Sequence, residues 1–218
     1  MRRKVGTVLV VLIVLLVAAG TVARLFLFAL AEPHHMAMAP AVLNGDELLL
    51  WRAGTPAEGE VIVYTREPGG ATQAIGRVIA VGPTRVEIAA GGMPKAVGDI
   101  DIVRIPIAPD GTEAAAGADA EAVLGGRASM METLPGGRSY RVILPARGGK
   151  GLAHAERTVD VPAGSYFVLN DNRGAPEPDS RSLGAIESAR VLGIARWFLG
   201  SGPYATASHK PAALDPVL

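Results

Sequence analysis

Hydrophobic residues follow two different patterns along the chain. Residues 5–23 form one run of 19 without a charged side chain, whereas from residue 47 onward apolar residues come in short runs separated by Gly, Pro and Asn. A helix of that length measures about 28 Å, close to the thickness of a bilayer's hydrocarbon core. The first pattern therefore predicts a transmembrane helix, and the second predicts a domain built of strands.

The short runs are rich in β-branched residues and are bounded by turn signals such as Asn44-Gly45-Asp46 and Gly82-Pro83, which favours antiparallel hairpins. Residues 111–126 predict a surface excursion or a short helix, and residues 147–151 predict a loop. The expected strands are residues 47–51, 60–64, 75–81, 85–89, 139–144, 158–161 and 165–169, with a last apolar element at 191–199.

These patterns divide the chain into an anchor, a domain and a tail. We expect the membrane anchor at residues 1–31 and a mainly β domain at 32–202, in which residues from about 105 to 165 form an inserted lobe. Residues 203–218 contain three prolines and predict a flexible tail.

Charges beside the apolar run predict its orientation. Arg2, Arg3 and Lys4 precede it, and basic residues stay on the cytoplasmic side of a membrane. The alternative is a cleaved secretory signal, with Ala29-Leu30-Ala31 as the cleavage site, but the apolar region of such a signal is usually about 7–15 residues long. We therefore expect a single-pass protein of the inner (cytoplasmic) membrane with a periplasmic or extracytoplasmic domain.

Composition excludes several classes of function. Four of the 21 basic residues precede the first acidic residue, Glu32, which leaves 17 basic against 21 acidic residues in the rest of the chain. That balance argues against a nucleic-acid partner, since phosphate binding needs a basic face. The chain has no cysteine, and its four histidines show no metal-binding spacing, so we expect no metal site and no cofactor.

One segment carries a specific resemblance. Tyr166-Phe-Val-Leu-Asn-Asp-Asn-Arg173 followed by Asp179-Ser-Arg181 is similar to the late box of bacterial type I signal peptidases, which reads Tyr-Phe-Val-Met-Gly-Asp-Asn-Arg and then Asp-Ser-Arg. Earlier in the chain, Met38-Ala-Pro-Ala-Val-Leu-Asn-Gly-Asp46 and Ile75-Gly-Arg-Val-Ile-Ala80 resemble the family's nucleophile and general-base boxes. Glu132-Thr-Leu-Pro-Gly-Gly-Arg-Ser-Tyr-Arg-Val142 resembles its mid-chain stretch.

The resemblance implies an antiparallel, barrel-like β fold on one transmembrane helix, and the cleavage of exported preproteins by a serine nucleophile and a lysine base. It also implies the membrane, signal peptides of exported preproteins and an active signal peptidase as partners. A lysine acts as a base near neutral pH when burial in an apolar site depresses its pKa.

The positions that correspond to this serine–lysine pair hold other residues. The serine position falls on Ala37 and the lysine position on Gly76, while the serine that assists the oxyanion hole falls on His35. Loss of the nucleophile alone lowers the turnover number of a serine protease by about 10⁶. The resemblance thus implies a pseudoenzyme with no intact catalytic group.

The late box keeps its charged and polar residues but loses the serine that the family has in the intervening turn, where Gly174-Ala-Pro-Glu-Pro178 stands here. Charge-assisted hydrogen bonds of the retained side chains are expected to hold strand ends together. This structural box comprises Asp171, Asn172, Arg173, Asp179, Ser180 and Arg181.

Two other groups could supply catalysis and are alternatives to the pseudoenzyme interpretation. Ser129-Met-Met-Glu-Thr-Leu134 imitates the nucleophile box but lacks its proline and its Gly-Asp ending, and His34 and His35 suggest a serine–histidine variant. Three functions stay open: an inactive homologue that binds signal peptides or an active peptidase, an active peptidase that uses Ser129, and an envelope interaction protein without enzymatic activity.

Overall fold

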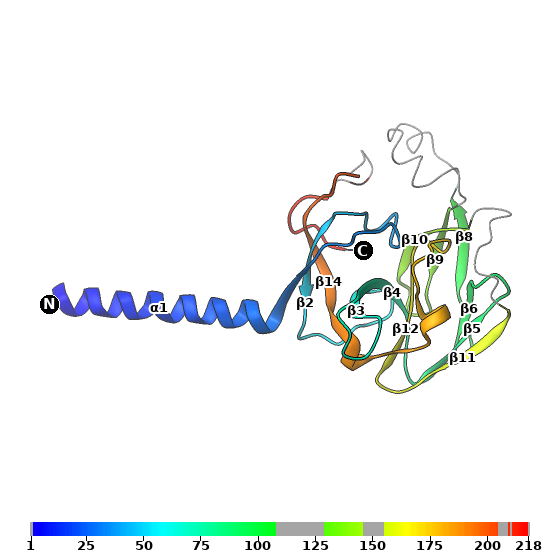
Figure 1. The fold of residues 1–218 in the computed structure, drawn as a ribbon, viewed down its shortest axis with the longest axis horizontal. Coiled ribbons are helices and arrows are strands. Elements are labelled where there is room, and N and C mark those ends of the chain that lie inside the picture. Colours follow the sequence, from blue (N-terminus) through cyan, green and yellow to red (C-terminus); the bar gives the residue numbers. More distant parts are fainter. Residues whose placement is uncertain (1, 108–128, 146–154, 205–208, 210, 218) are drawn as a thin grey trace.

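The computed structural model describes residues 2–107, 129–145, 155–204, 209 and 211–217. The surface excursion predicted at 111–126 and the loop predicted at 147–151 lie outside these residues. What is described is one long helix and three β-sheets (Figure 1).

The first element is helix α1 (Arg2–Leu27), which projects from the β domain (Figure 1). Its apolar side chains at residues 9–17 and at Val22 are all more than half exposed. Within the described part of the chain, no helix combines the length and the apolar character needed to cross a membrane. The structure therefore confirms a helix at the predicted place without confirming that it spans a membrane.

The helix ends four residues before the predicted end of the anchor. Residues Phe28–Ala31 form strand β1, which pairs antiparallel with β2 (Glu47–Trp51), and the Arg52 amide donates to the Leu27 carbonyl oxygen at 2.8 Å. The segment weighed as a signal cleavage site, Ala29-Leu30-Ala31, is thus part of the sheet.

The largest sheet has seven strands in the order β1-β2-β14-β3-β4-β12-β13. Its last strand in the sequence, β14, lies between β2 and β3, and only residues 188–190 connect it to the edge strand β13 (Figure 1). The remaining bounds are β3 (Val61–Thr65), β4 (Gln73–Val81), β12 (Ser165–Leu169), β13 (Ile186–Glu187) and β14 (Val191–Gly200).

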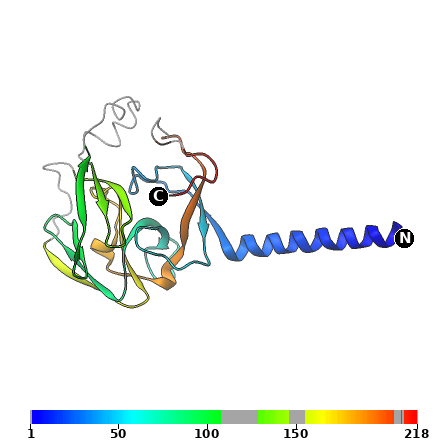
Figure 2. The same ribbon diagram turned by 180° about the vertical axis from the view of Figure 1, so that it is seen from behind.

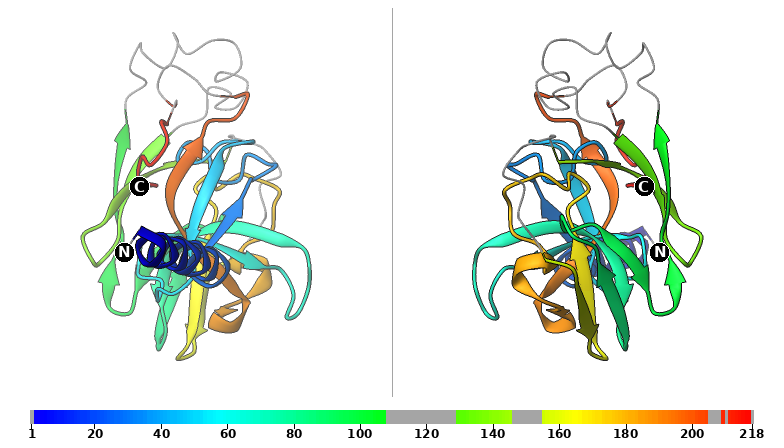
Figure 3. Two further views of the ribbon diagram at one scale, coloured as in Figure 1. Left: turned by 90° about the vertical axis from the view of Figure 1, so that its left-hand side faces the viewer. Right: turned by 90° about the vertical axis from the view of Figure 1, so that its right-hand side faces the viewer.

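Two smaller sheets lie beside it (Figures 2 and 3). One has the order β11-β5-β6-β7 and the other the order β10-β9-β8, and all pairings in the three sheets are antiparallel. The predicted mainly β, antiparallel fold is confirmed. The bounds are β5 (Thr84–Ile88), β6 (Pro94–Val97), β7 (Ile100–Asp101), β8 (Val103–Ile107), β9 (Ser129–Thr133), β10 (Ser139–Ile143) and β11 (Arg157–Val161).

Alternation along the central strands buries the large sheet on both faces. Val61 and Val63 of β3 pack in one apolar cluster, with Met38 and Ile75, whereas Ile62 and Tyr64 pack in another. Successive side chains of a strand point to opposite faces, so a continuous apolar run is the expected sequence of a strand covered on both sides. A third cluster joins β4 and β12 to the two smaller sheets.

The predictions missed several short elements. Strands β1, β6, β7, β8, β9 and β13 were not expected, and residues 129–133 were interpreted only as the beginning of the following segment. Most of these strands are short and have few β-branched residues, so their local signal is weak and pairing with neighbours decides them. Strand β8 is rich in Val and Ile, but its Pro106 disfavours a strand assignment. Two helical turns, α4 (Ser180–Leu183) and η1 (Ser188–Arg190), were also missed.

Candidate functional site

The segment that resembles the nucleophile box lies against the late box. Ala37 is completely buried, and its carbonyl oxygen accepts a hydrogen bond from the Asn172 amide at 2.9 Å. The Asn172 side chain donates to the carbonyl oxygen of Met36 at 3.3 Å. Hydrogen bonds across 135 positions of sequence thus place Ala37 next to the Asp-Asn-Arg triplet.

The Ala37 amide already has a hydrogen-bond acceptor two residues earlier in the chain. It donates to Nδ1 of His35 at 3.4 Å. Burial lowers the pKa of this histidine, a nearby Glu177 opposes that shift and Arg66 adds to it. The lowered pKa favours the neutral imidazole, and the tautomer that accepts at Nδ1 carries its proton on Nε2.

The lysine position, Gly76, lies in the middle of β4, between β3 and β12. It shares a strand face with Ala74 and Val78, whose side chains pack with Val168 of β12. A Cβ atom at Gly76 would lie 2.5 Å from Val168 Cγ1 and 3.3 Å from the Leu169 carbonyl oxygen. The place of a side chain is therefore already filled.

Residues 168–173 connect the two positions. Val168 packs over Gly76, and four residues later Asn172 binds Ala37. This segment continues from β12 into a turn, and its Ile143–Asn172 bridge joins it to the three-stranded sheet. The structure thus brings the three resembling boxes into one region, while it offers a methyl group and a hydrogen at the two aligned positions.

Buried ion pairs surround this region. Arg77 donates to both carboxylate oxygens of Asp171, with Nη2 2.6 Å from Oδ2, and neither side chain is exposed. The Arg77 guanidinium also donates to the Gly59 carbonyl oxygen at 2.7 Å and lies 4.4 Å from the centre of the Tyr140 ring. Planar guanidinium groups suit such bidentate and stacked contacts.

Glu132 is the second centre of charge. Its carboxylate accepts from Arg173 and Tyr140 through Oε1 and from Arg104, at 2.8 Å, through Oε2. Burial raises the pKa of this carboxyl, but Arg173 and Arg104 outweigh burial and hold the pKa below its usual value. Glu132 therefore stays ionised and joins β9 to the late box.

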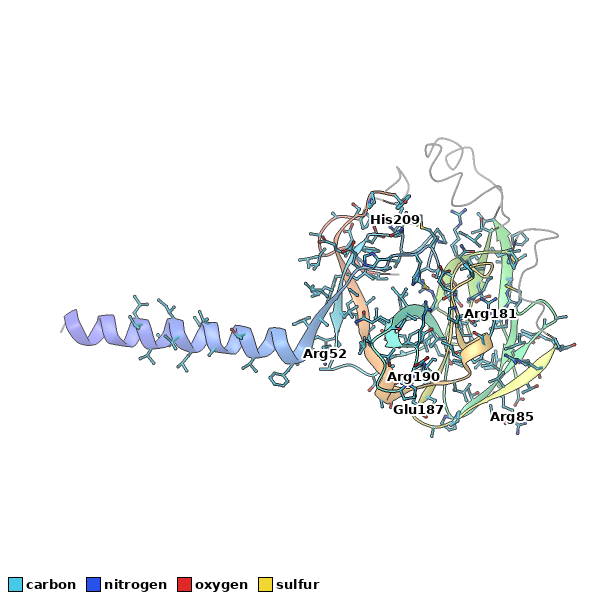
Figure 4. The ribbon with its side chains drawn as sticks, viewed as in Figure 1. Arg52, Arg85, Arg181, Glu187, Arg190 and His209 are labelled. Carbon is cyan, nitrogen blue, oxygen red and sulfur yellow. The ribbon has the colours of Figure 1, made fainter. Side chains whose placement is uncertain are left out.

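The rest of the structural box caps the next turn. Asp179 is the N-cap of α4 and accepts from the amide and from the guanidinium of Arg181, at 2.9 Å to Nε. Arg181 (Figure 4) also donates to the Arg173 carbonyl oxygen at 2.9 Å. The Ser180 hydroxyl accepts from the Val168 amide at 2.9 Å. All six residues of the structural box are buried and hydrogen-bonded.

Ser129, the displaced nucleophile weighed from the sequence, lies at the start of β9 opposite Ile143. Its hydroxyl oxygen accepts from Nη2 of Arg141 at 2.9 Å. A guanidinium stays protonated in proteins and cannot take a proton from a hydroxyl. This contact does not activate the serine.

Sequence reasoning missed the roles of Glu132 and Tyr140. It also missed the buried ion pair of Arg77. A charged residue inside an apolar strand is the signal that could have indicated such an ion pair, because buried charges need partners. Arg77 in Ala74-Ile-Gly-Arg-Val-Ile79 is the example. Among the described residues, no group of three His, Asp or Glu side chains is arranged to hold a metal ion.

Comparison with known proteins adds an independent observation. Residues 5–199 match the family model described as signal peptidase, peptidase S26. No curated protein matches the chain. Among solved structures, the chain is similar to a signal peptidase I from Enterococcus faecalis, with 19% identity over 65% of this chain and 97% of that chain and a TM-score of 0.33. Because the family model covers nearly the whole chain and the three boxes meet in the fold, the protein belongs to the signal peptidase family, peptidase S26.

Proposed function

We propose that this protein is a signal peptidase homologue without peptidase activity that binds the signal peptides of exported preproteins at the membrane. The observation that carries the proposal is the filled position at Gly76. A family member needs a lysine there, and here Val168 occupies the space that its first side-chain atom would take.

The nucleophile position supports the same proposal. The Ala37 methyl group cannot attack a carbonyl carbon, and its amide already donates to His35. Serine hydrolases depend on a nucleophile with an adjacent base and on free donors for the oxyanion. The base and nucleophile positions hold Gly76 and Ala37, and the Ala37 amide already donates to His35. We therefore propose that the β domain binds signal peptides without cleaving them.

The membrane part of the proposal is supported by α1. The 19 uncharged residues at 5–23, preceded by Arg2, Arg3 and Lys4, have the pattern of an anchor whose N-terminus is cytoplasmic. The exposed side chains at residues 9–17 give the helix an apolar surface with no protein partner in the described chain. Insertion into lipid would remove this surface from water.

The experiment uses the full chain in detergent and a preprotein with an Ala-x-Ala cleavage site. We expect no cleavage product, and we expect a photoreactive signal peptide to crosslink near Met38, which follows the aligned position Ala37. An unrelated apolar peptide without the small-residue site is the control.

Two outcomes would overturn the proposal. Cleavage that disappears in Ser129→Ala would identify an active peptidase with a displaced nucleophile. Absence of both cleavage and crosslinking would favour an envelope interaction protein that has lost peptide binding.

A further inference from the structure

The C-terminal segment is bound to the β domain rather than extended from it. We name its described residues, His209 and 211–217, the C-terminal strap. The Phe198 amide donates to the Asp215 carbonyl oxygen at 2.8 Å, and the Val217 amide donates to the Arg196 carbonyl oxygen at 3.0 Å. Trp197 and Pro216 form an antiparallel bridge. The strap therefore adds a short strand to β14.

The strap occupies an edge that β14 would otherwise leave open. On one side Trp197 pairs with Leu49 of β2, so the strap must use the other side. On that other side β3 pairs only with the first part of β14, from Val191 to Ile194. The backbone groups of Arg196 and Phe198 are thus the ones that an added extended strand can reach.

The end of the strap packs against the apolar cluster that contains Met38, the residue after Ala37. Val217 packs against the cluster that contains Met38 and Ile75. Met38 follows Ala37 directly, whereas the Ile75 side chain points to the sheet face opposite that of Gly76. An extended peptide that paired with β14 at Arg196 and Phe198, and placed a small apolar side chain on this cluster, would take the position that Val217 holds.

A buried carboxylate fastens the strap at its other end. Asp46, at the end of the nucleophile-like box, accepts from the Gly202 amide at 3.0 Å and lies 2.7 Å from His209 Nε2 (Figure 4). The His209 ring also lies edge-on to Phe198, with ring centres 5.7 Å apart. The strap is therefore held by side chains at His209 and by backbone pairing at Val217.

We propose that the C-terminal strap is an internal competitor for the peptide-binding surface, and that an extended peptide with small apolar side chains binds only after the strap leaves. The proposal rests on the peptide binding proposed above. It gives that binding a regulatory step. A surface that is free only in a minor population binds with an affinity reduced by that fraction.

A disulfide staple tests the competition directly. Trp197 and Pro216 are a non-hydrogen-bonded antiparallel pair, because the flanking amides make the bonds. Cα atoms of such pairs lie about 4.5 Å apart, within the range that a disulfide spans. The chain has no native cysteine. The variant Trp197→Cys/Pro216→Cys can therefore be locked and released by oxidation and reduction.

The readout is the affinity of the full chain in detergent for a fluorescent peptide that ends in Ala-x-Ala. We expect the oxidised staple to bind at least about tenfold more weakly than the reduced staple. His209→Ala, which keeps Trp197, should bind more tightly than the wild type. Leu214→Ala is the matched control, because that side chain lies on the strap but is 65% exposed, and it should bind like the wild type.

The outcomes separate the two proposals. Equal affinity of oxidised and reduced staple, with His209→Ala unchanged, would overturn the strap as a competitor and leave peptide binding intact. If no variant binds the peptide, including the reduced staple and His209→Ala, then peptide binding itself is wrong.

Discussion

Arg77 and Asp171 form a fully buried bidentate ion pair between β4 and the late box, with Nε 2.9 Å from Oδ1 and Nη2 2.6 Å from Oδ2. Arg77 follows Gly76 directly, and Asp171 precedes Asn172, the residue that binds Ala37. One ion pair thus fixes the strand that carries Gly76 against the segment that binds Ala37. Such a pair holds the two segments at a fixed distance from each other.

Breaking this pair should destabilise the domain strongly. Asp171→Ala leaves the Arg77 guanidinium buried without its carboxylate, and loss of one partner of a buried pair costs about 3–5 kcal/mol of unfolding free energy. Denaturant unfolding followed by circular dichroism measures the change. Asp160→Ala is the control, since it removes the exposed partner of Arg85 and should cost no more than about 1 kcal/mol. Equal losses in the two variants would contradict the role of the buried pair.

A methyl group at Gly76 should itself be unfavourable. Gly76→Ala places Cβ 2.5 Å from Val168 Cγ1, and overpacking of this kind costs about 1–3 kcal/mol. Because valine has a stiff side chain, the backbone must give way. Gly136→Ala, where the new atom meets only Glu58 Oε2 at 3.4 Å, should change stability little. The double variant Gly76→Ala/Val168→Ala should lose less than the sum of the single changes, and an additive loss would show that the two residues do not compete for space.

Acid should remove the contribution of Glu132. Its pKa in the folded protein is below the usual 4.5 because Arg173 and Arg104 outweigh burial. A depressed pKa means that the carboxylate stabilises the fold fully above the unfolded pKa, and that this contribution disappears as the pH falls through the folded pKa. The wild type should therefore be more stable than Glu132→Gln at pH 7, and the difference in unfolding free energy should shrink below about pH 4.5. A difference independent of pH would refute this account.

Charges on α1 should release the protein from membranes if the proposed anchor is correct. Lysine near the centre of a spanning helix costs about 2.5–3.5 kcal/mol per residue, so Leu12→Lys/Leu16→Lys should move the protein to the soluble fraction after an alkaline wash. Val103→Lys/Ile105→Lys is the control, because these apolar side chains of β8 are equally exposed but lie outside the helix. Retention of the α1 variant with the membranes would contradict anchoring by this helix.

Much of the fold could be predicted because its signals are local. The uncharged run at 5–23 predicted a helix that the structure places at Arg2–Leu27, and the run at 165–169 predicted β12 with the same bounds. The run at 75–81 predicted β4 to within two residues. Period and turn residues are properties of neighbouring positions, so the sequence carries them directly. The boxes likewise indicated the family from spacing alone.

The tail shows the limit of such signals. Its prolines predicted a flexible end, yet its described residues pair with β14 and reach Asp46. A proline lacks a backbone N–H donor, so a proline-rich tail has few hydrogen bonds to make within itself. Its pairing instead depends on an open strand edge that residues far away in the sequence form.

The sequence by itself determined which chemical groups are absent, because Ala37 has no hydroxyl and Gly76 has no amine in any conformation. Only the tertiary structure decided what fills their places. Val168 covers Gly76, Glu132 pairs with Arg173, and His209 reaches Asp46 across 163 positions. Contacts between distant positions arise from the packing of whole sheets, and no local pattern of residues encodes which side chains will meet.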